Sequence, residues 1–165
     1  MNTNNQDSGA FLIGIISDTH GYLNPQVFTV FKDVHCIIHA GDIGDPSILT
    51  ELETIAPVHA VRGNTDIWAA HLPPIKKITV GPITLFALHD LDTLPHNQIT
   101  SDIKAVISGH THQQLVQKNN DVLFINPGTA GRKDSPGTVA LLRLNGGELT
   151  TQIKPLQPAP HPHRA

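Results

Sequence analysis

The chain has 165 residues, of which 39% are hydrophobic and 15% are charged, and its formal net charge at neutral pH is −3. This length suits one domain with a core of its own, and the composition excludes a wholly disordered chain. The acidic balance, without a run of Lys or Arg, disfavours nucleic acid as a partner. The single cysteine excludes an internal disulfide and a multi-thiolate zinc site.

The two ends of the chain differ in composition from its middle. The first ten residues contain neither a basic region nor an apolar stretch, and the apolar run that follows, Phe11 to Ile16, is too short for a signal sequence or a membrane span. Residues 155–165 contain four prolines and two histidines. We therefore expect a flexible segment over 1–10, a single domain over 11–154, a flexible Pro- and His-rich tail over 155–165, and a cytoplasmic protein without membrane association.

The first half of the chain alternates apolar strands with short helical segments, which is typical of a parallel sheet with crossover helices. Strands are predicted at Phe11–Ile16, His35–His39 and Val58–Val61. Helices are predicted at Pro25–Phe31 and Pro46–Thr54. Asn24 and Asp45 are the expected N-caps, since each directly precedes a proline that suits the first helical position.

From Pro74 onward, apolar runs joined by brief turns replace this alternation. Strands are predicted at Ile75–Val80, Ile83–Leu88, Ala105–Ser108, Gln114–Gln117, Val122–Ile125, Thr138–Leu144 and Leu149–Ile153. Only Pro95–Ser101 is predicted as another helix. The expected fold class is therefore α/β, with two packed mixed β-sheets flanked by helices.

Side chains that bind metal ions follow several of these predicted strands directly. They are Asp18 and His20, Asp42, Asn64, His89, and His110 with His112. Because ligands of open α/β sheets gather beyond the carboxyl ends of the strands, these five loops are expected to converge. Carboxylate, amide and imidazole ligands without a thiolate suit Mn²⁺, Fe, Zn²⁺, Co²⁺ or Ni²⁺ better than Ca²⁺. Five other histidines, at positions 35, 39, 59, 71 and 96, fit no ligand motif.

The order of these motifs resembles that of the calcineurin-like metallophosphoesterase superfamily, and in particular of its small single-domain phosphodiesterases. The resemblance extends from Phe11 to Val139 and rests on Asp18-Thr19-His20, Gly41-Asp42, Gly63-Asn64, His89 and Gly109-His110-Thr111-His112. Asn126-Pro127-Gly128-Thr129 is similar to the Asn-Pro-Gly-Ser segment of these small enzymes. The resemblance implies a four-layer α/β/β/α sandwich and two divalent metal ions, among which Mn²⁺ is favoured.

The resemblance also implies a role for each candidate ligand. It assigns Asp18, His20 and His112 to one metal ion, Asn64, His89 and His110 to the other, and Asp42 to both as the bridging carboxylate. Asp42, Asn64 and His89 would then support catalysis by a metal-activated water, and Asn64 would also contact the substrate. Arg132, which follows two glycines, is interpreted either as a ligand of the substrate phosphate or as a solvated loop residue.

The proton donor for the leaving group stays open. Larger members of the superfamily often have a histidine directly after the Gly-Asn pair, whereas this chain has Thr65-Asp66. Asp66 is interpreted as a helix cap in preference to a general acid. Asp90 stands where small relatives commonly have glycine, and it is interpreted either as a loop acid or as a residue that orients His89 or narrows the mouth of the site.

These patterns predict a metal-dependent phosphodiesterase that hydrolyses a small phosphodiester through a water activated between two metal ions. Two alternatives stay open: a non-catalytic protein-binding scaffold on the same fold, as in the retromer subunit of this family, and a nuclease. Scaffolds of this kind lose ligand residues, whereas every ligand position is filled here. The sequence does not name the substrate, and it leaves a homo-oligomer open.

Overall fold

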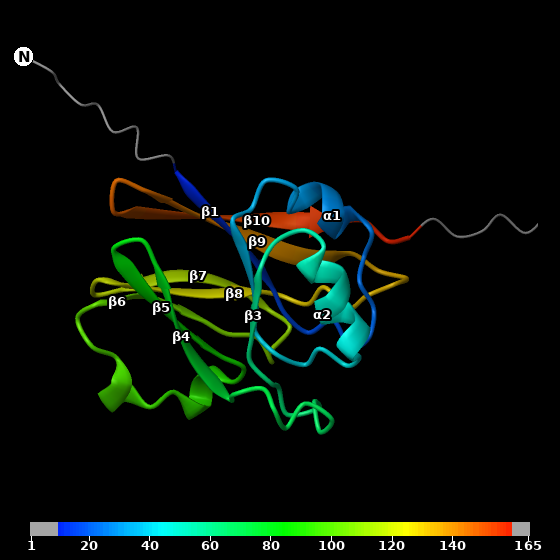
Figure 1. Ribbon diagram of the computed structural model, residues 1–165, viewed down its shortest axis with the longest axis horizontal. Coiled ribbons are helices and arrows are strands. Elements are labelled where there is room, and N and C mark those ends of the chain that lie inside the picture. Colours follow the sequence, from blue (N-terminus) through cyan, green and yellow to red (C-terminus); the bar gives the residue numbers. More distant parts are fainter. Residues whose placement is uncertain (1–9, 160–165) are drawn as a thin grey trace, which may run out of the picture.

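The structure, a computed structural model, describes residues 10–159 of the chain. Two β-sheets of five strands each pack face to face, and both contain parallel and antiparallel pairs (Figure 1). The expected pair of packed mixed sheets is therefore confirmed. Most of the predicted flexible segment (1–9) and the end of the predicted tail (160–165) lie outside the described residues.

The first sheet has the strand order β10-β9-β1-β2-β3. Its strands are β1 (Phe11–Ile16), β2 (Cys36–His39), β3 (Val58–Ala60), β9 (Gly137–Asn145) and β10 (Glu148–Leu156). β1, β2 and β3 are parallel, as the βαβαβ pattern predicts, and β9 and β10 extend the sheet as an antiparallel hairpin. The carboxyl ends of the three parallel strands therefore meet at one edge of the sheet.

The second sheet has the strand order β4-β5-β6-β8-β7. Its strands are β4 (Ile75–Val80), β5 (Ile83–Leu88), β6 (Ile103–Ile107), β7 (Gln114–Asn119) and β8 (Val122–Pro127). The strands β5, β6 and β8 are parallel, and β4 and β7 pair antiparallel at the two edges. The two strands that precede His89 and His110 thus point the same way.

Two short α-helices cover the outer face of the first sheet: α1 (Gln26–Val30) and α2 (Pro46–Glu53) (Figure 1). Asp45 is the N-cap of α2, and its carboxylate accepts a hydrogen bond from Ser47 N at 2.8 Å. Asn24 accepts from Gln26 N at 2.9 Å, although α1 itself begins only at Gln26. The predicted cap is therefore confirmed at Asp45 and wrong at Asn24, because the N-cap of α1 is Pro25 and Asn24 lies one residue before it.

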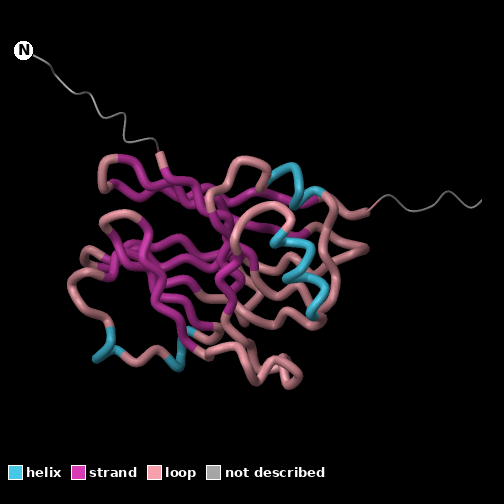
Figure 2. Tube along the Cα trace, in the orientation of Figure 1, coloured by secondary structure: helices cyan, strands magenta, loops and turns pink. Residues whose placement is uncertain are grey.

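The predicted helix at Pro95–Ser101 is wrong. This segment contains only the 3₁₀ helix η2 (His96–Gln98), which follows another 3₁₀ helix, η1 (Leu91–Thr93) (Figure 2). The segment lacks apolar residues at the i, i+3, i+4 spacing that a packed α-helix needs. Leu94 and Ile99 instead pack singly on the outer face of the second sheet. Within residues 10–159, the fourth layer is thus a loop with two 3₁₀ turns.

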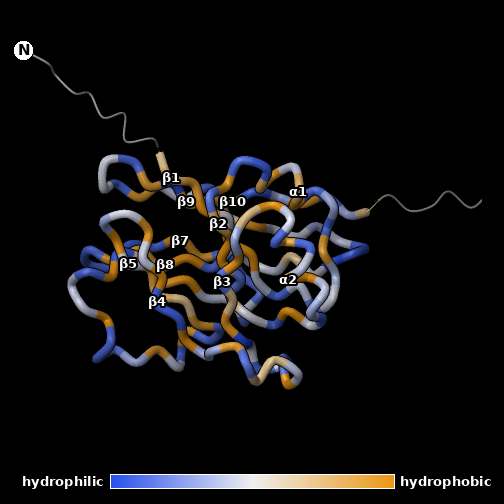
Figure 3. Tube along the Cα trace, viewed as in Figure 1, coloured by the Kyte–Doolittle hydropathy of each residue, from blue (hydrophilic) through white to orange (hydrophobic). Residues whose placement is uncertain are grey.

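The main core lies between the sheets. Ile13, Ile15 and Ile38 of the first sheet meet Leu85 and Ile107 of the second, and all five side chains are fully buried. Figure 3 shows hydrophobic residues concentrated along these strands. Because the central parallel strands are buried on both faces, they have nearly continuous apolar sequences, which is why their positions were predictable.

The last strand is longer than predicted. β10 extends to Leu156, where the sequence pattern places the strand end at Ile153 and the start of the tail at residue 155. Pro155 registers with Thr138 and Leu156 registers with Gly137, and the Leu156 side chain is fully buried among the helices of the first sheet. A proline is tolerated here because β10 is an edge strand, where one face of the backbone makes no ladder hydrogen bonds.

Candidate metal centre

All seven candidate ligands lie at the carboxyl ends of strands, three loops from the first sheet and two from the second. Hydrogen bonds join the two sets of loops. His110 N donates to Asp18 Oδ2 at 3.1 Å, and His89 Nδ1 donates to Ala40 O at 2.7 Å. The five loops predicted to converge therefore do so, at the edge where the two sheets meet.

Asp18, His20 and His112 form the first group of side chains that could hold a metal ion. His112 Nε2 lies 3.2 Å from Asp18 Oδ1, and His20 Nε2 lies 3.9 Å from the same oxygen. The two imidazole Nε2 atoms are 3.2 Å apart. Asp18 is fully buried whereas both histidines are exposed, so this group opens to solvent.

Asp18 also belongs to a second, buried group with Asp42 and His89. His89 Nε2 lies 3.4 Å from Asp42 Oδ2, and both side chains are about 5% exposed. Asn64 and His110 stand beside this group. Asn64 Oδ1 is 3.1 Å from His110 Nδ1, and the rings of His110 and His89 are 5.1 Å apart between centroids. The structure thus brings together all seven predicted side chains.

The backbone at the ligands is unusual. Five of the seven ligand residues adopt a left-handed conformation, which non-glycine residues rarely do. They are Asp18 (φ 54°), His20 (φ 46°), Asp42 (φ 53°), His110 (φ 69°) and His112 (φ 60°). Each such residue costs about 1 kcal/mol or more, and strain of this kind clusters at functional sites.

Two buried ligand atoms have no hydrogen-bond partner within the described part of the chain: Asp18 Oδ1 and His89 Nε2. Burying such atoms unpaired costs free energy, and each is the atom with which its side chain would bind a metal ion. His89 Nδ1 donates to Ala40 O, which leaves Nε2 as the ring nitrogen available to a metal ion. The residues present therefore fit a divalent cation.

The surroundings of Asp42 favour the ionised form of its carboxyl group. Burial alone would raise the pKa of this carboxyl group, but hydrogen bonding by Thr65 and the nearby imidazoles of His89 and His20 outweigh it, so that the pKa is lowered. The backbone N–H of Thr65 donates to Asp42 Oδ1 at 3.0 Å. The carboxylate is therefore ionised at neutral pH, as a carboxylate that binds a metal ion needs to be.

One interpretation of the sequence is that Asp90 orients His89, and the structure does not support it. The Asp90 carboxylate accepts from Asp92 N at 3.0 Å and caps η1, and Ala40 O takes the orienting position instead. A backbone carbonyl leaves no side-chain signature, so the sequence could not indicate it. Asp90 is a capping residue that happens to follow a ligand.

Asp66 does not cap the segment after it with its side chain. Its Oδ1 accepts from Ile43 N at 2.9 Å and from Gly44 N at 3.0 Å, and its Oδ2 accepts from Gly63 N at 2.8 Å. The side chain is 2% exposed. Asp66 therefore joins the loop that carries Asp42 to the loop that carries Asn64.

His39 is another buried link that fits no ligand motif. Gly41 N donates to His39 Nδ1 at 3.2 Å, so the proton is on Nε2 and is donated to Thr19 Oγ1 at 2.9 Å. Thr19 Oγ1 in turn donates to Ile43 O at 2.9 Å. Burial is the main reason why the pKa of His39 is lowered from 6.5 to about 3. This chain of hydrogen bonds couples the loops after β1 and β2.

Three further polar residues support the loops of the candidate ligands. Ser17 Oγ donates to Asp18 Oδ2 at 2.6 Å, and Asn126 Nδ2 donates to Gly109 O at 2.7 Å beneath the two histidines. Thr129 Oγ1 donates to Asp18 O at 2.9 Å. The Asn-Pro-Gly-Thr segment was the only sequence signal for these supporting residues. It marks the loop that hydrogen-bonds the backbone at Asp18 and directly before His110.

The remaining candidates lie at the edge of the site. Thr65 is exposed, at the position where a proton-donating histidine often stands. Arg132 is also exposed, directly after Gly131, whose N–H donates to Asp18 O at 2.9 Å. Arg132 therefore follows the ligand loops closely in the fold, without a hydrogen bond of its side chain among residues 10–159.

A model of the calcineurin-like phosphoesterase superfamily domain matches residues 11–147 of the chain. The chain belongs to this superfamily. As a calcineurin-like phosphoesterase, it is a member of a family that hydrolyses phosphoric esters with divalent metal ions. The candidate ligands of both groups lie within the matched range.

Individual proteins similar to this calcineurin-like phosphoesterase support the same family membership. A probable metallophosphoesterase of Methanothermobacter thermautotrophicus is 38% identical over 157 residues, which cover 86% of this chain and 91% of that protein. The structure of an archaeal phosphodiesterase has a TM-score of 0.71 and 26% identity, covering 87% of this chain and 100% of that one. Zinc-bound Vps29 of Entamoeba histolytica, at 22% identity, has a TM-score of 0.69 over 89% of this chain and 99% of its own, and shares the fold.

No helix within residues 10–159 is long and apolar enough to cross a membrane.

Proposed function

We propose that this chain is a phosphodiesterase with two divalent metal ions, of which Mn²⁺ is the favoured one, acting on a small phosphodiester in the cytoplasm. One observation carries the proposal: Asp18 Oδ1 and His89 Nε2 are buried and unpaired among the described residues, next to Asp42 and His112. The likeness to an archaeal phosphodiesterase supports a diester in preference to a monoester. The catalytic unit is the proposed single domain, whose predicted end at residue 154 moves to Leu156 because β10 extends to that buried residue.

The first ligand set follows the group of Asp18, His20 and His112, and the second set and the bridging role of Asp42 follow the resemblance to the superfamily. Asp18, His20 and His112 would hold one ion, Asn64, His89 and His110 would hold the other, and Asp42 would serve both. Two divalent ions supply charge neutralisation at phosphorus and a water of lowered pKa. Histidine and asparagine complete these sets without adding negative charge that would repel a phosphate. The neutral Asn64 amide also faces solvent, where it can contact a substrate oxygen.

None of Thr65, Asp66 and Asp90 is suited to donate a proton to the leaving group. Asp66 is occupied by three backbone N–H groups, and Asp90 caps a 3₁₀ helix. Thr65 stands at the position where larger relatives carry histidine. We therefore propose that the enzyme acts best on esters whose leaving group departs without protonation.

The scaffold alternative draws on the likeness to Vps29, which concerns the fold. It predicts no turnover, whereas the phosphodiesterase proposal predicts turnover that depends on metal. A nuclease would need a basic surface, which the net charge of −3 disfavours. A hydrolysis assay with single-stranded and double-stranded DNA as substrates tests the nuclease alternative.

The deciding experiment measures hydrolysis of bis(4-nitrophenyl) phosphate by metal-stripped protein, restored separately with Mn²⁺, Ni²⁺, Zn²⁺ or Mg²⁺. We expect Mn²⁺ to restore the highest rate, and Asp42→Asn to lower both metal content and activity. If no metal restores turnover and Asp42→Asn changes neither quantity, the proposed function is wrong. Turnover of 4-nitrophenyl phosphate alone would make the protein a monoesterase.

A further inference from the structure

A hollow of about 290 Å³ lies beside the ligand cluster. It is lined by Arg62, Gly63, Asn64, Asp66, Ile67 and Ala70. Asn64 is the only one of the seven candidate ligands in this lining, so the hollow adjoins the cluster without being part of it. A substrate whose phosphate lies at the candidate ligands could therefore place another of its groups in this hollow.

The guanidinium of Arg62 in this hollow has N–H groups that donate no hydrogen bond to residues 10–159. Arg62 Nη1 donates to Ala70 O at 3.3 Å, and this is the only hydrogen bond of the Arg62 side chain within residues 10–159. No carboxylate of that part of the chain pairs with it. A guanidinium is always charged and has five N–H donors in a planar fork, which suits the oxygens of phosphate or carboxylate.

The wall that carries Arg62 is fixed in place. Arg62 N donates to Pro73 O at 3.1 Å, and Gly63 N donates to Asp66 Oδ2 at 2.8 Å. Ile67, which also lines the hollow, is 91% exposed, which makes it the most exposed of the large hydrophobic residues in the described range. The hollow therefore combines an unpaired cation with an apolar side chain at its rim, a pairing that suits an anionic group attached to an apolar or aromatic ring.

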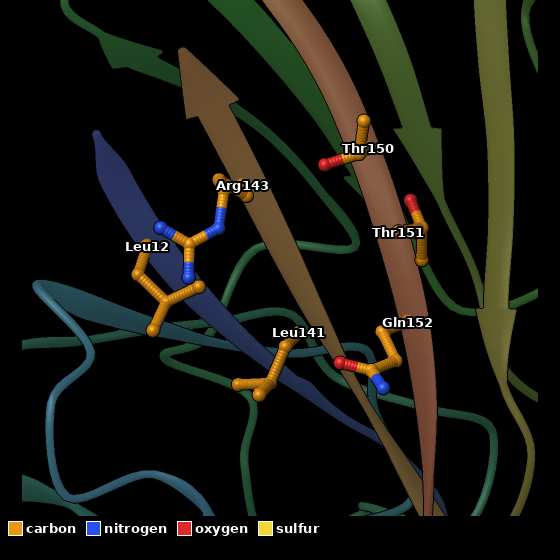
Figure 4. A pocket seen from close by; sticks show the side chains of 6 residues that line it. All are labelled: Leu12, Leu141, Arg143, Thr150, Thr151 and Gln152. Atoms are coloured by element: carbon orange, nitrogen blue, oxygen red, sulfur yellow. The ribbon is translucent and has the colours of Figure 1, made fainter.

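A second arginine in a hollow offers a contrast. Arg143 lines a hollow of about 170 Å³ on the outer face of the first sheet, with Leu12, Leu141, Thr150, Thr151 and Gln152 (Figure 4). Arg143 registers with Leu12 of β1 and with Thr150 of β10. None of these lining residues is a candidate ligand. Arg143 is thus an exposed arginine in a comparable setting that no substrate at the ligands would be expected to touch.

We propose that Arg62 binds a second anionic group of the substrate, so that the preferred substrates are phosphodiesters that also carry a phosphate, as nucleotide esters with a terminal phosphate do. This inference rests on the proposed phosphodiesterase function. The scissile phosphate occupies the ligand cluster, and the second phosphate lies against the Arg62 guanidinium past Asn64. Ile67 contacts the ring that joins the two groups.

The test uses two substrates that differ by one phosphate: the 4-nitrophenyl ester of thymidine 5′-phosphate, with and without a 3′-phosphate. Both release the same 4-nitrophenolate, so the ratio of their kcat/KM values reports only the added anion. We expect wild-type enzyme to prefer the bisphosphate about 10-fold, because one charged hydrogen-bonded contact has that effect. Arg62→Gln should remove the preference, Arg62→Lys should keep part of it, and Arg143→Gln should leave it unchanged.

The outcomes separate the two proposals. No turnover of either ester by metal-loaded wild-type protein contradicts the phosphodiesterase function itself. Equal kcat/KM values for the two esters in the wild type overturn the Arg62 inference and leave the phosphodiesterase function standing. The same holds for an Arg62→Gln variant that is folded by circular dichroism and retains the preference. Because the wild-type ratio is decisive alone, an unfolded variant would not leave the inference untested.

Discussion

His89 donates the proton on Nδ1 to Ala40 O over 2.7 Å, which fixes a side chain of the second sheet against the end of β2 in the first. The bond sets both the tautomer and the direction of the ring, so Nε2 points at Asp42.

His89→Ala removes this imidazole and should lower metal content from two ions to one per chain. Activity should fall by about 100-fold or more, since even the loss of a partner that merely orients a ligand costs 10- to 100-fold. Elemental analysis and the diester assay measure the two effects. His96→Ala is the control, because His96 is exposed on η2 and should change neither. Retention of both ions by His89→Ala would remove His89 from the ligand set.

Asp66→Asn tests the link between the loops of Asp42 and Asn64. An amide of the same shape cannot accept all three backbone N–H groups, so we expect metal affinity to fall about 10- to 100-fold and the metal-free protein to lose about 1–3 kcal/mol of unfolding free energy. Isothermal titration with Mn²⁺ and urea unfolding measure these quantities. Asp45→Asn is a matched control, because an asparagine caps a helix as well as aspartate does. Equal affinities in the two variants would contradict the positioning role.

Stability of the metal-free protein should depend on pH through His39. Burial lowers its pKa from 6.5 to about 3 in the folded state, so below pH 6.5 the unfolded chain takes up a proton that the folded chain does not. The His39 contribution is therefore complete above that pH and is lost at about 1.4 kcal/mol per pH unit as the pH falls towards 3. Urea unfolding between about pH 5 and pH 8 measures the slope. His39→Gln should reduce it, and an unchanged slope would show that other groups cause it.

Thr65→His should supply the proton donor that the chain lacks at this position. The substitution keeps the backbone N–H that Asp42 accepts, and the exposed side chain has room for an imidazole. We expect rates on alkyl esters, whose leaving groups need a proton, to rise about 10-fold, with little change on 4-nitrophenyl esters. Thr65→Phe controls for size. If both variants show the same dependence on leaving-group pKa as the wild type, a proton donor exists elsewhere.

Much of the fold could be predicted from local patterns. Asp45-Pro46 marks the start of α2, and the continuous apolar runs mark the buried strands. The order of the strands could not be predicted, because β9 pairs with β1 across more than half of the chain. The start of β6 at Ile103 also depends on a distant partner, since Ile103 registers with Thr84 next to a register shift.

In the candidate site, too, one part could be predicted from local sequence patterns and another part could not. The convergence of the candidate ligands was predictable because each of them follows a strand with its own motif. The residues that hold those loops were not, because they hydrogen-bond backbone atoms far away in sequence: His89 reaches Ala40, and Asp66 reaches Ile43. A pattern within one segment carries no information about a carbonyl or amide of another. The sequence therefore indicated a cap at Asp66 and a possible orienting role at Asp90, whereas Asp66 is the buried link between loops and Asp90 is the cap.

The left-handed backbone at Asp18, His20, Asp42, His110 and His112 makes these positions poor choices for folding alone. Glycine would adopt the same angles without strain. His20→Gly or His112→Gly should therefore yield a metal-free protein that is more heat-resistant and catalytically dead. Selection for stability alone would erase this centre, so the strained residues indicate that something other than stability has kept them in the chain.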